Sequence, residues 1–225
     1  LTVTANVVQE AIDQQVDMVV THHPIPFKGV KKLSTDSSTG ALLWNLASNG
    51  ISVYSPHTAF DSARNGINQQ LAVGLGLTEI RPLMPNQDSD DERLHGLGTG
   101  RVGVCESTTL KEFASSVSAF LQIDGLHVVG DPLMQISRIG IGCGSAGEFI
   151  RPASRAGCHL LLTGEARFHT CLEAESLGIG MVLPGHYASE RFALESLAQQ
   201  LVSEFSDLTV WASRSERDPL SWQAG

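Results

Sequence analysis

Histidines paired with carboxylates are the residues of this chain best suited to chemistry. Six residues form the pattern: His22 and His23 side by side, His57 with Asp61 four residues later, and His186 with Glu190 four residues later. Imidazole and carboxylate groups bind Zn, Fe, Mn or Co, and these ligand types do not select one of the four. The sequence therefore predicts a site for divalent transition-metal ions.

The positions of the histidines strengthen this prediction. His22, His23, His57 and His186 each follow a short apolar run that is typical of a buried strand. Open α/β sheets bind ligands at the carboxyl ends of their strands. A single histidine is most often a surface or hydrogen-bonded residue, but four at strand ends indicate a shared site.

Local geometry predicts how these ligands divide between ions. Neighbouring side chains on an extended backbone point in opposite directions, and Pro24 favours an extended His23. We therefore expect His22 and His23 to serve two neighbouring ions. His186 and Glu190 lie one helical turn apart on one face, so Glu190 is placed to bridge. Two ions about 3.5–4 Å apart share and acidify a water molecule, which is hydrolytic chemistry.

The elements that position these residues follow an α/β pattern, because short β-rich runs alternate with helical stretches. Helices are predicted over residues 7–15, 40–48, 66–73, 110–121, 149–156, 170–176 and 189–203. Strands are predicted over residues 18–21, 51–54, 100–104, 126–130, 139–142, 160–163, 179–183 and 208–211. Residues 82–93, rich in Pro, Asn, Asp and Ser, are predicted to be a linker.

The two halves of the chain resemble each other. Residues 17–23 align with residues 159–165, and residues 50–61 align with residues 178–190, so that each half has a strand ending in Thr and a later strand followed by His-x-x-x-carboxylate. We interpret this as an internal duplication, with a first α/β repeat over residues 1–84 and a second over residues 94–225. The metal site is expected between the repeats.

Two further motifs allow more than one interpretation. Residues 142–147 spell G-x-G-x-x-G, and the backbone N–H groups of Gly144, Ser145 and Gly147 could hold a substrate phosphate or carboxylate. A dinucleotide site and a purely structural turn are the alternatives. Glu165 follows the strand that mirrors the one before His22, where it could act as a general acid or base near the metals. It could equally be a carboxylate favoured at a helix N-terminus.

Composition limits the class of protein. The chain has 225 residues, 42% of them hydrophobic, and a net charge of −9, which argues against direct binding of nucleic acid. Four cysteines without a C-x-x-C pair fit a reducing compartment, so a cytoplasmic protein is expected. No apolar run reaches the length of a membrane span. Residues 1–4 are already strand-like, and we expect a native N-terminal segment, with a targeting peptide left open, to precede them.

Five motifs in this order resemble the Ngg-interacting-factor-three-like family, whose members are often named type 2 homologues of GTP cyclohydrolase I. The motifs are Thr21-His22-His23-Pro24, residues 54–61, residues 142–147, Thr163-Gly164-Glu165, and residues 185–190. The resemblance covers nearly the whole chain, although the family's usual first helix and part of its first strand are missing. It implies two intertwined duplicated α/β repeats with mixed sheets in a layered arrangement, a toroidal homohexamer, and a dinuclear metal site inside the ring.

The resemblance also assigns roles to residues of this chain. It implies that the metal ligands are His22, His23, Asp61, His186 and Glu190, with Glu190 bridging the ions and His57 beside them. The leading hypothesis is a hydrolase in which a metal-bound hydroxide attacks a small phosphorylated or heterocyclic substrate, while His57 or Glu165 moves protons. The alternatives are a metal-binding scaffold or regulatory protein without turnover, and a nucleotide-binding module that uses the glycine loop.

Overall fold

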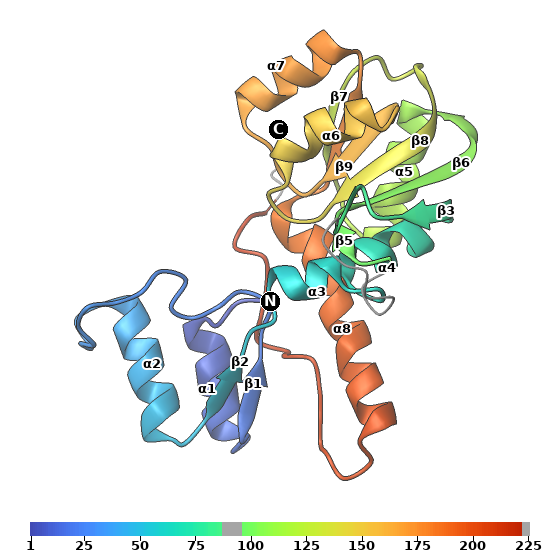
Figure 1. Cartoon of the computed structure of the whole chain (residues 1–225). Helices are drawn as coiled ribbons and strands as arrows, with labels where there is room; N and C mark the ends of the chain where they lie inside the picture. The colour runs from blue at the N-terminus through green and yellow to red at the C-terminus, as the bar shows by residue number, and fades with distance from the viewer. Residues whose placement is uncertain (87–95, 222–225) are drawn as a thin grey trace. The chain divides into compact units, whose positions relative to one another are not determined.

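The computed structural model describes residues 1–86 and 96–221 (Figure 1). The chain forms two compact units, each built from segments that are distant in sequence. Among the described residues, unit 1 contains Leu1–Phe60 and Leu194–Pro219, and unit 2 contains the remainder. These units are compact bodies and differ from the sequence repeats 1–84 and 94–225, whose common origin stays a prediction.

Unit 1 is built on a short parallel pair of strands. Strand β1 (Met18–Val20) pairs with β2 (Ser52–Tyr54), with Val19 opposite Val53. Helices α1 (Ala5–Asp13) and α2 (Ser38–Ser48) pack against each other. Their apolar faces meet the strands in a core of five buried residues: Val3, Val8, Ala11, Leu46 and Ile51. Parallel strands require a crossover between them, and here α2 provides it.

The C-terminal segment of unit 1 is held by one carboxylate on α1. Glu10 accepts hydrogen bonds from the Trp211 indole (3.1 Å), the Ser213 hydroxyl (2.6 Å) and the backbone N–H groups of Arg214 (3.1 Å) and Ser215 (3.0 Å). Burial alone would raise the pKa of Glu10, but these hydrogen bonds lower it to about 2. Residues 211–215 are therefore held against α1 by a side chain.

Unit 2 is built on a mixed six-stranded sheet among the described residues, in the order β3-β6-β8-β9-β10-β7. Its central strands β8 (Gln135–Gly142), β9 (Leu160–Thr163) and β10 (Gly180–Leu183) run parallel, while β3 (Thr78–Arg81), β6 (Arg101–Thr109) and β7 (His127–Val129) are antiparallel to their neighbours. Strands β9 and β10 are buried along their whole length. Continuous apolar strands of this kind form where both faces of a sheet are covered.

Helices complete unit 2. Helix α6 (Ile150–Arg155) packs against α7 (Phe168–Leu177), and the two lie together beside the parallel strands (Figure 1). Helices α4 (Ile67–Gly74) and α5 (Leu110–Leu121) pack against β6. Helix α5 begins with a reciprocal cap between Thr109 and Glu112, which satisfies two N–H groups of its first turn.

Most predicted elements are confirmed, and the α/β class with a mixed sheet is correct. The predicted strand over residues 208–211 is wrong, because this segment has no strand partner and its Trp211 is bound by the Glu10 side chain. Three features were missed: the short helix α3 (Thr58–Ser62), strand β3, and the pair formed by β4 (Met84–Pro85) and β5 (Gly98–Thr99). Residues 87–93 of the predicted linker lie outside the described residues.

Candidate metal centre

Unit 1 brings three of the predicted histidines together. The ring centroids of His22 and His23 lie 5.0 Å apart, those of His22 and His57 5.2 Å apart, and those of His23 and His57 5.8 Å apart. Each ring offers one nitrogen that lies within 4.8 Å of the others. His22 is buried, and the other two are half-buried. Three convergent imidazole nitrogens are a common donor set for a divalent transition metal.

The backbone before this cluster turns instead of staying extended. The N–H groups of His22 and His23 both donate to the carbonyl oxygen of Leu1, at 3.1 and 3.0 Å, and the Thr21 hydroxyl donates to the same oxygen at 2.7 Å. Successive N–H groups of an extended chain point to opposite sides, so the expectation of an extended backbone at these two residues is wrong. The expectation that His22 and His23 serve two neighbouring ions stays a prediction.

His57 occupies a left-handed backbone conformation, with φ of +45°. This region is uncommon for residues other than glycine and costs on the order of 1 kcal/mol. The conformation turns the chain between β2 and α3, and the N–H of Phe60 donates to the His57 carbonyl at 2.8 Å. The His57 ring also meets the edge of Phe27, with centroids 5.8 Å apart.

Unit 2 gathers a second group at the carboxyl ends of its parallel strands. Glu165 follows β9, and His186 and Glu190 lie in the first turns of helix α8 (His186–Glu204), which follows β10. The His186 ring bonds Glu165 through Nδ1 (3.0 Å) and Glu190 through Nε2 (3.1 Å). The hydrogen bond to Glu190, followed by the one to Glu165, raises the pKa of His186 to about 9. Carboxylates that stabilise a proton here would also stabilise a cation.

Asp61 belongs to the same group in unit 2. One of its carboxylate oxygens lies within 4.8 Å of a Glu190 oxygen, and the thiol of Cys143 donates to Asp61 Oδ1 at 3.1 Å. Burial, followed by the charges of Asp61 and Glu190, raises the pKa of Cys143 well above its usual value. The thiol therefore stays protonated and acts as a donor that orients the Asp61 carboxylate.

Two buried polar side chains fix the backbone around Asp61. The Asn68 amide donates to the Asp61 carbonyl (3.1 Å) and accepts from the Cys143 N–H (2.7 Å). Arg101 donates to the carbonyls of Ser62 (3.2 Å) and Ala63 (2.8 Å). These contacts hold the end of α3, where Asp61 lies.

The remaining donors of Arg101 bond the Gln69 side chain (2.9 Å) and the carbonyls of Gly98 (2.9 Å) and Gly100 (2.7 Å). The five N–H groups of its guanidinium are thus matched by five oxygens, none of which belongs to a carboxylate. Burial lowers the pKa of Arg101. Its role is to hold backbone carbonyls in place.

The glycine loop after β8 is tied to the first turn of α8. The Gly144 N–H donates to the Ser189 hydroxyl at 2.9 Å, and Ser189 in turn donates to the His186 carbonyl at 2.8 Å. The N–H of Ala146 donates to Thr163 at 3.1 Å. These bonds fit the structural interpretation of the loop; substrate contacts at Gly144, Ser145 and Gly147 stay a prediction.

The residues present fit divalent metal ions in both units. Unit 1 supplies three imidazoles with convergent nitrogens, and unit 2 supplies one imidazole and two carboxylates that are close together. The sequence predicted all six of these side chains. It did not predict Asn68, Arg101, Cys143 or Ser189. Cys143 lies in the motif at residues 142–147 and Ser189 in the motif at residues 185–190, so both could have been predicted. No local pattern marks Asn68 or Arg101.

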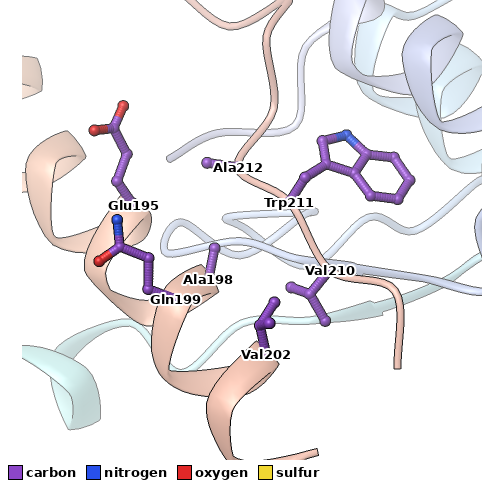
Figure 2. A pocket seen from close by; sticks show the side chains of 7 residues that line it. All are labelled: Glu195, Ala198, Gln199, Val202, Val210, Trp211 and Ala212. Atoms are coloured by element: carbon purple, nitrogen blue, oxygen red, sulfur yellow. The ribbon is translucent and has the colours of Figure 1, made fainter. Parts of the chain in front are cut away.

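A separate open groove of about 430 Å³ lies in unit 1, between the later turns of α8 and the following segment (Figure 2). Seven residues line it: Glu195, Ala198, Gln199, Val202, Val210, Trp211 and Ala212. The lining is mostly apolar and lacks the imidazole and thiol groups that bind transition metals. We therefore assign the metal chemistry to the two clusters and not to this groove.

Among the described residues, every helix is too short or too polar to cross a lipid bilayer.

Comparison with known proteins supports the resemblance seen in the motifs. Residues 1–219 match the model of the family described as Duf34/NIF3 (NGG1p interacting factor 3). The chain is 33% identical to the Protein NIF3 homolog of Schizosaccharomyces pombe, over 97% of this chain and 81% of that protein. It is 32% identical to a protein of Nostoc sp. named GTP cyclohydrolase 1 type 2 homolog, over 90% of this chain and 76% of the relative.

A solved structure shows the same fold. The Staphylococcus aureus protein SA1388 superimposes with a TM-score of 0.87 at 24% sequence identity, covering 99% of this chain and 86% of that one.

Proposed function

Because this chain belongs to the Duf34/NIF3 family, we propose that it is a hydrolase that uses two divalent metal ions to act on a small phosphorylated or heterocyclic compound. The observation that carries the proposal is the convergence of His22, His23 and His57 in unit 1. His22 and His23 present ring nitrogens close together, and His57 holds a third imidazole beside them in a strained backbone conformation. Such strain is costly to maintain without a function.

In the proposal five side chains hold the ions: His22, His23, Asp61, His186 and Glu190. Carboxylate oxygens of Asp61 and Glu190 are close enough to each other to face a common ion.

Divalent ions would supply Lewis acidity, which polarises a carbonyl or phosphoryl oxygen and makes water a better nucleophile at neutral pH. The side chains of the protein would orient the metal ligands and move protons. Glu165 holds Nδ1 of His186, so that Nε2 faces Glu190. His57, beside the two other imidazoles, is placed to accept or return a proton during hydrolysis.

The test combines elemental analysis with a hydrolysis screen. Purified wild-type chain should contain about two equivalents of a transition metal and should turn over a member of a panel of nucleotides and phosphoesters. GTP belongs in this panel because the relatives are named for a GTP cyclohydrolase. His23→Ala and His186→Ala should each lose metal and turnover together.

His169→Ala is the matched control, because His169 is an exposed histidine at the start of α7 that belongs to none of the possible metal-ligand groups among the described residues. It should keep both metal and activity. Wild-type chain without bound transition metal would contradict the proposal. Full metal content with no turnover across the panel would replace the hydrolase with a metal-binding scaffold.

A further inference from the structure

The lysines of this chain are concentrated in one short segment. Of the four lysines in the sequence, three lie within five residues, at Lys28, Lys31 and Lys32, while the chain as a whole carries a net charge of −9. All three are exposed, and no ion pair is formed by them within residues 1–86 and 96–221. A local positive patch on an acidic protein attracts anions selectively to that place.

The same segment carries an exposed aromatic ring beside the imidazole cluster. Phe27 is 67% exposed, and its ring meets that of His57 at a centroid distance of 5.8 Å and an interplanar angle of 77°. An exposed phenylalanine gains little from burial and leaves a flat apolar surface open to a ligand. Because Phe27 contacts His57, this surface adjoins the cluster formed by His22, His23 and His57.

We infer that residues 27–32 form the substrate-recognition segment, in which Phe27 stacks on a planar ring and the three lysines bind a phosphate of the same molecule. This inference rests on the proposed function and narrows its substrate to a phosphorylated planar heterocycle, of which a nucleotide is one example. Lysine ammonium groups bind phosphate as flexible point charges. An aromatic ring stacks on any planar base without reading its identity.

The aromatic ring and the lysines of residues 27–32 are best explained together, as one binding site. A phosphate site alone would not place a large apolar ring in water next to the histidines. A stacking platform alone would not require three of the four lysines of the chain. The surroundings of Gly29 agree with a binding segment that is open to a ligand. Nothing lies within 4 Å of the position where its Cβ would be, so the chain between Phe27 and Lys31 is open on that side.

The test measures binding by calorimetry to the full-length chain at low salt, with metal content measured in parallel. GMP, UMP and FMN carry both a planar ring and a phosphate, guanosine carries only the ring, and ribose 5-phosphate carries only the phosphate. Phe27→Ala should weaken GMP, UMP, FMN and guanosine about tenfold, while Phe27→Trp should restore the affinity. The triple change of Lys28, Lys31 and Lys32 to Ala should weaken the phosphorylated probes about tenfold and flatten the dependence on salt.

The chain offers a matched control for each change. Phe168 is 71% exposed and also meets a histidine ring, that of His169, with centroids 5.8 Å apart. Lys111, the fourth lysine, is exposed on α5 in unit 2. Phe168→Ala and Lys111→Ala should leave the affinity for every probe unchanged.

Three results would overturn the inference. The first is that no probe binds the wild-type chain with a Kd below about 1 mM, the upper range of enzyme substrates. The second is that the Phe27 and lysine variants bind as tightly as their controls. The third is that single-stranded DNA binds more tightly than any mononucleotide and depends on the lysines but not on Phe27. Metal content separates these results from failure of the proposed function, because each variant should keep the metal content of wild type.

Discussion

Replacing Arg101 tests whether a buried guanidinium that binds only oxygens of the backbone and one amide stabilises unit 2. In Arg101→Met the side chain keeps a similar length and loses every donor. Four backbone carbonyls, those of Ser62, Ala63, Gly98 and Gly100, then lose their charged partner. At about 1 kcal/mol for each of these four hydrogen bonds lost, the loss sums to about 4 kcal/mol.

Part of this loss is offset, because methionine no longer requires a charge to be buried. Removing that desolvation cost returns several kcal/mol for a strongly hydrated ion and less, about 2 kcal/mol, for the weakly hydrated guanidinium. The free energy of unfolding should therefore fall by about 2 kcal/mol. Arg101→Lys keeps the charge but offers three donors in place of five. Its free energy of unfolding should therefore lie between that of wild type and that of the methionine variant.

The assay is urea unfolding followed by circular dichroism and tryptophan fluorescence. Arg138→Met is the matched control, because Arg138 is exposed on the neighbouring strand β8 and its side chain makes one hydrogen bond, at 3.3 Å, to the Ala156 carbonyl. This control should change stability by less than about 0.5 kcal/mol. The reasoning is refuted if the Arg101 and Arg138 methionine variants unfold at the same urea concentration.

Three shorter predictions concern single side chains. The pKa of Glu10 is about 2 in the folded chain and near 4.5 when unfolded. Its contribution to the free energy of unfolding is therefore complete above pH 4.5 and disappears as the pH falls toward 2. After discounting for solvent exposure, Glu10→Gln should lower the free energy of unfolding by about 1 kcal/mol at pH 7 and leave it unchanged at pH 2. Gly144→Ala should cost more stability than Gly178→Ala, because both have left-handed φ but only a Cβ at Gly144 would meet the Glu190 carboxylate; equal urea midpoints would contradict this. Glu165→Gln should weaken metal binding about 10- to 100-fold in a chelator competition, because it no longer orients His186 as a carboxylate does; unchanged affinity would assign Glu165 a different role.

Elements with a strong local signal could be predicted, and elements set by tertiary contacts could not. The apolar runs of β9 and β10 are buried on both faces, and their boundaries matched closely. Helix α3 has five residues, too few for a helical period to be visible in the sequence. Residues 208–211 have the composition of a strand, but the nearby segment satisfies its polar groups with Glu10 on α1.

The candidate site shows the same division. Histidines and carboxylates at strand ends were found because their chemistry and spacing are local features. Asn68 and Arg101 were not found, because their partners are backbone carbonyls and an N–H distant in sequence, and such groups carry no signature in the amino-acid sequence. The backbone at His22 and His23 was not predicted for a similar reason: one carbonyl, that of Leu1, accepts both of their N–H groups and turns the chain at this point.

Glycines allow the loops around helix α8 to lie in close backbone contact. A Cβ on Gly164 would lie 2.5 Å from the Ser189 hydroxyl, 2.7 Å from the Gly144 carbonyl and 3.0 Å from the His186 Cα. The Gly164 carbonyl also accepts from the Gly185 N–H at 2.9 Å. The loop after β8, the end of β9 and the first turn of α8 are therefore in backbone contact, and only residues without a side chain allow this approach. In a dinucleotide site glycines bring the backbone close to a pyrophosphate; here Gly144, the second glycine of the pattern, lies beside the Glu190 carboxylate and the His186 ring of that helix. Gly164→Ala should consequently displace that helix and weaken metal binding more than it lowers the urea midpoint of unfolding, whereas an equal effect on both would mean that the glycine serves packing alone.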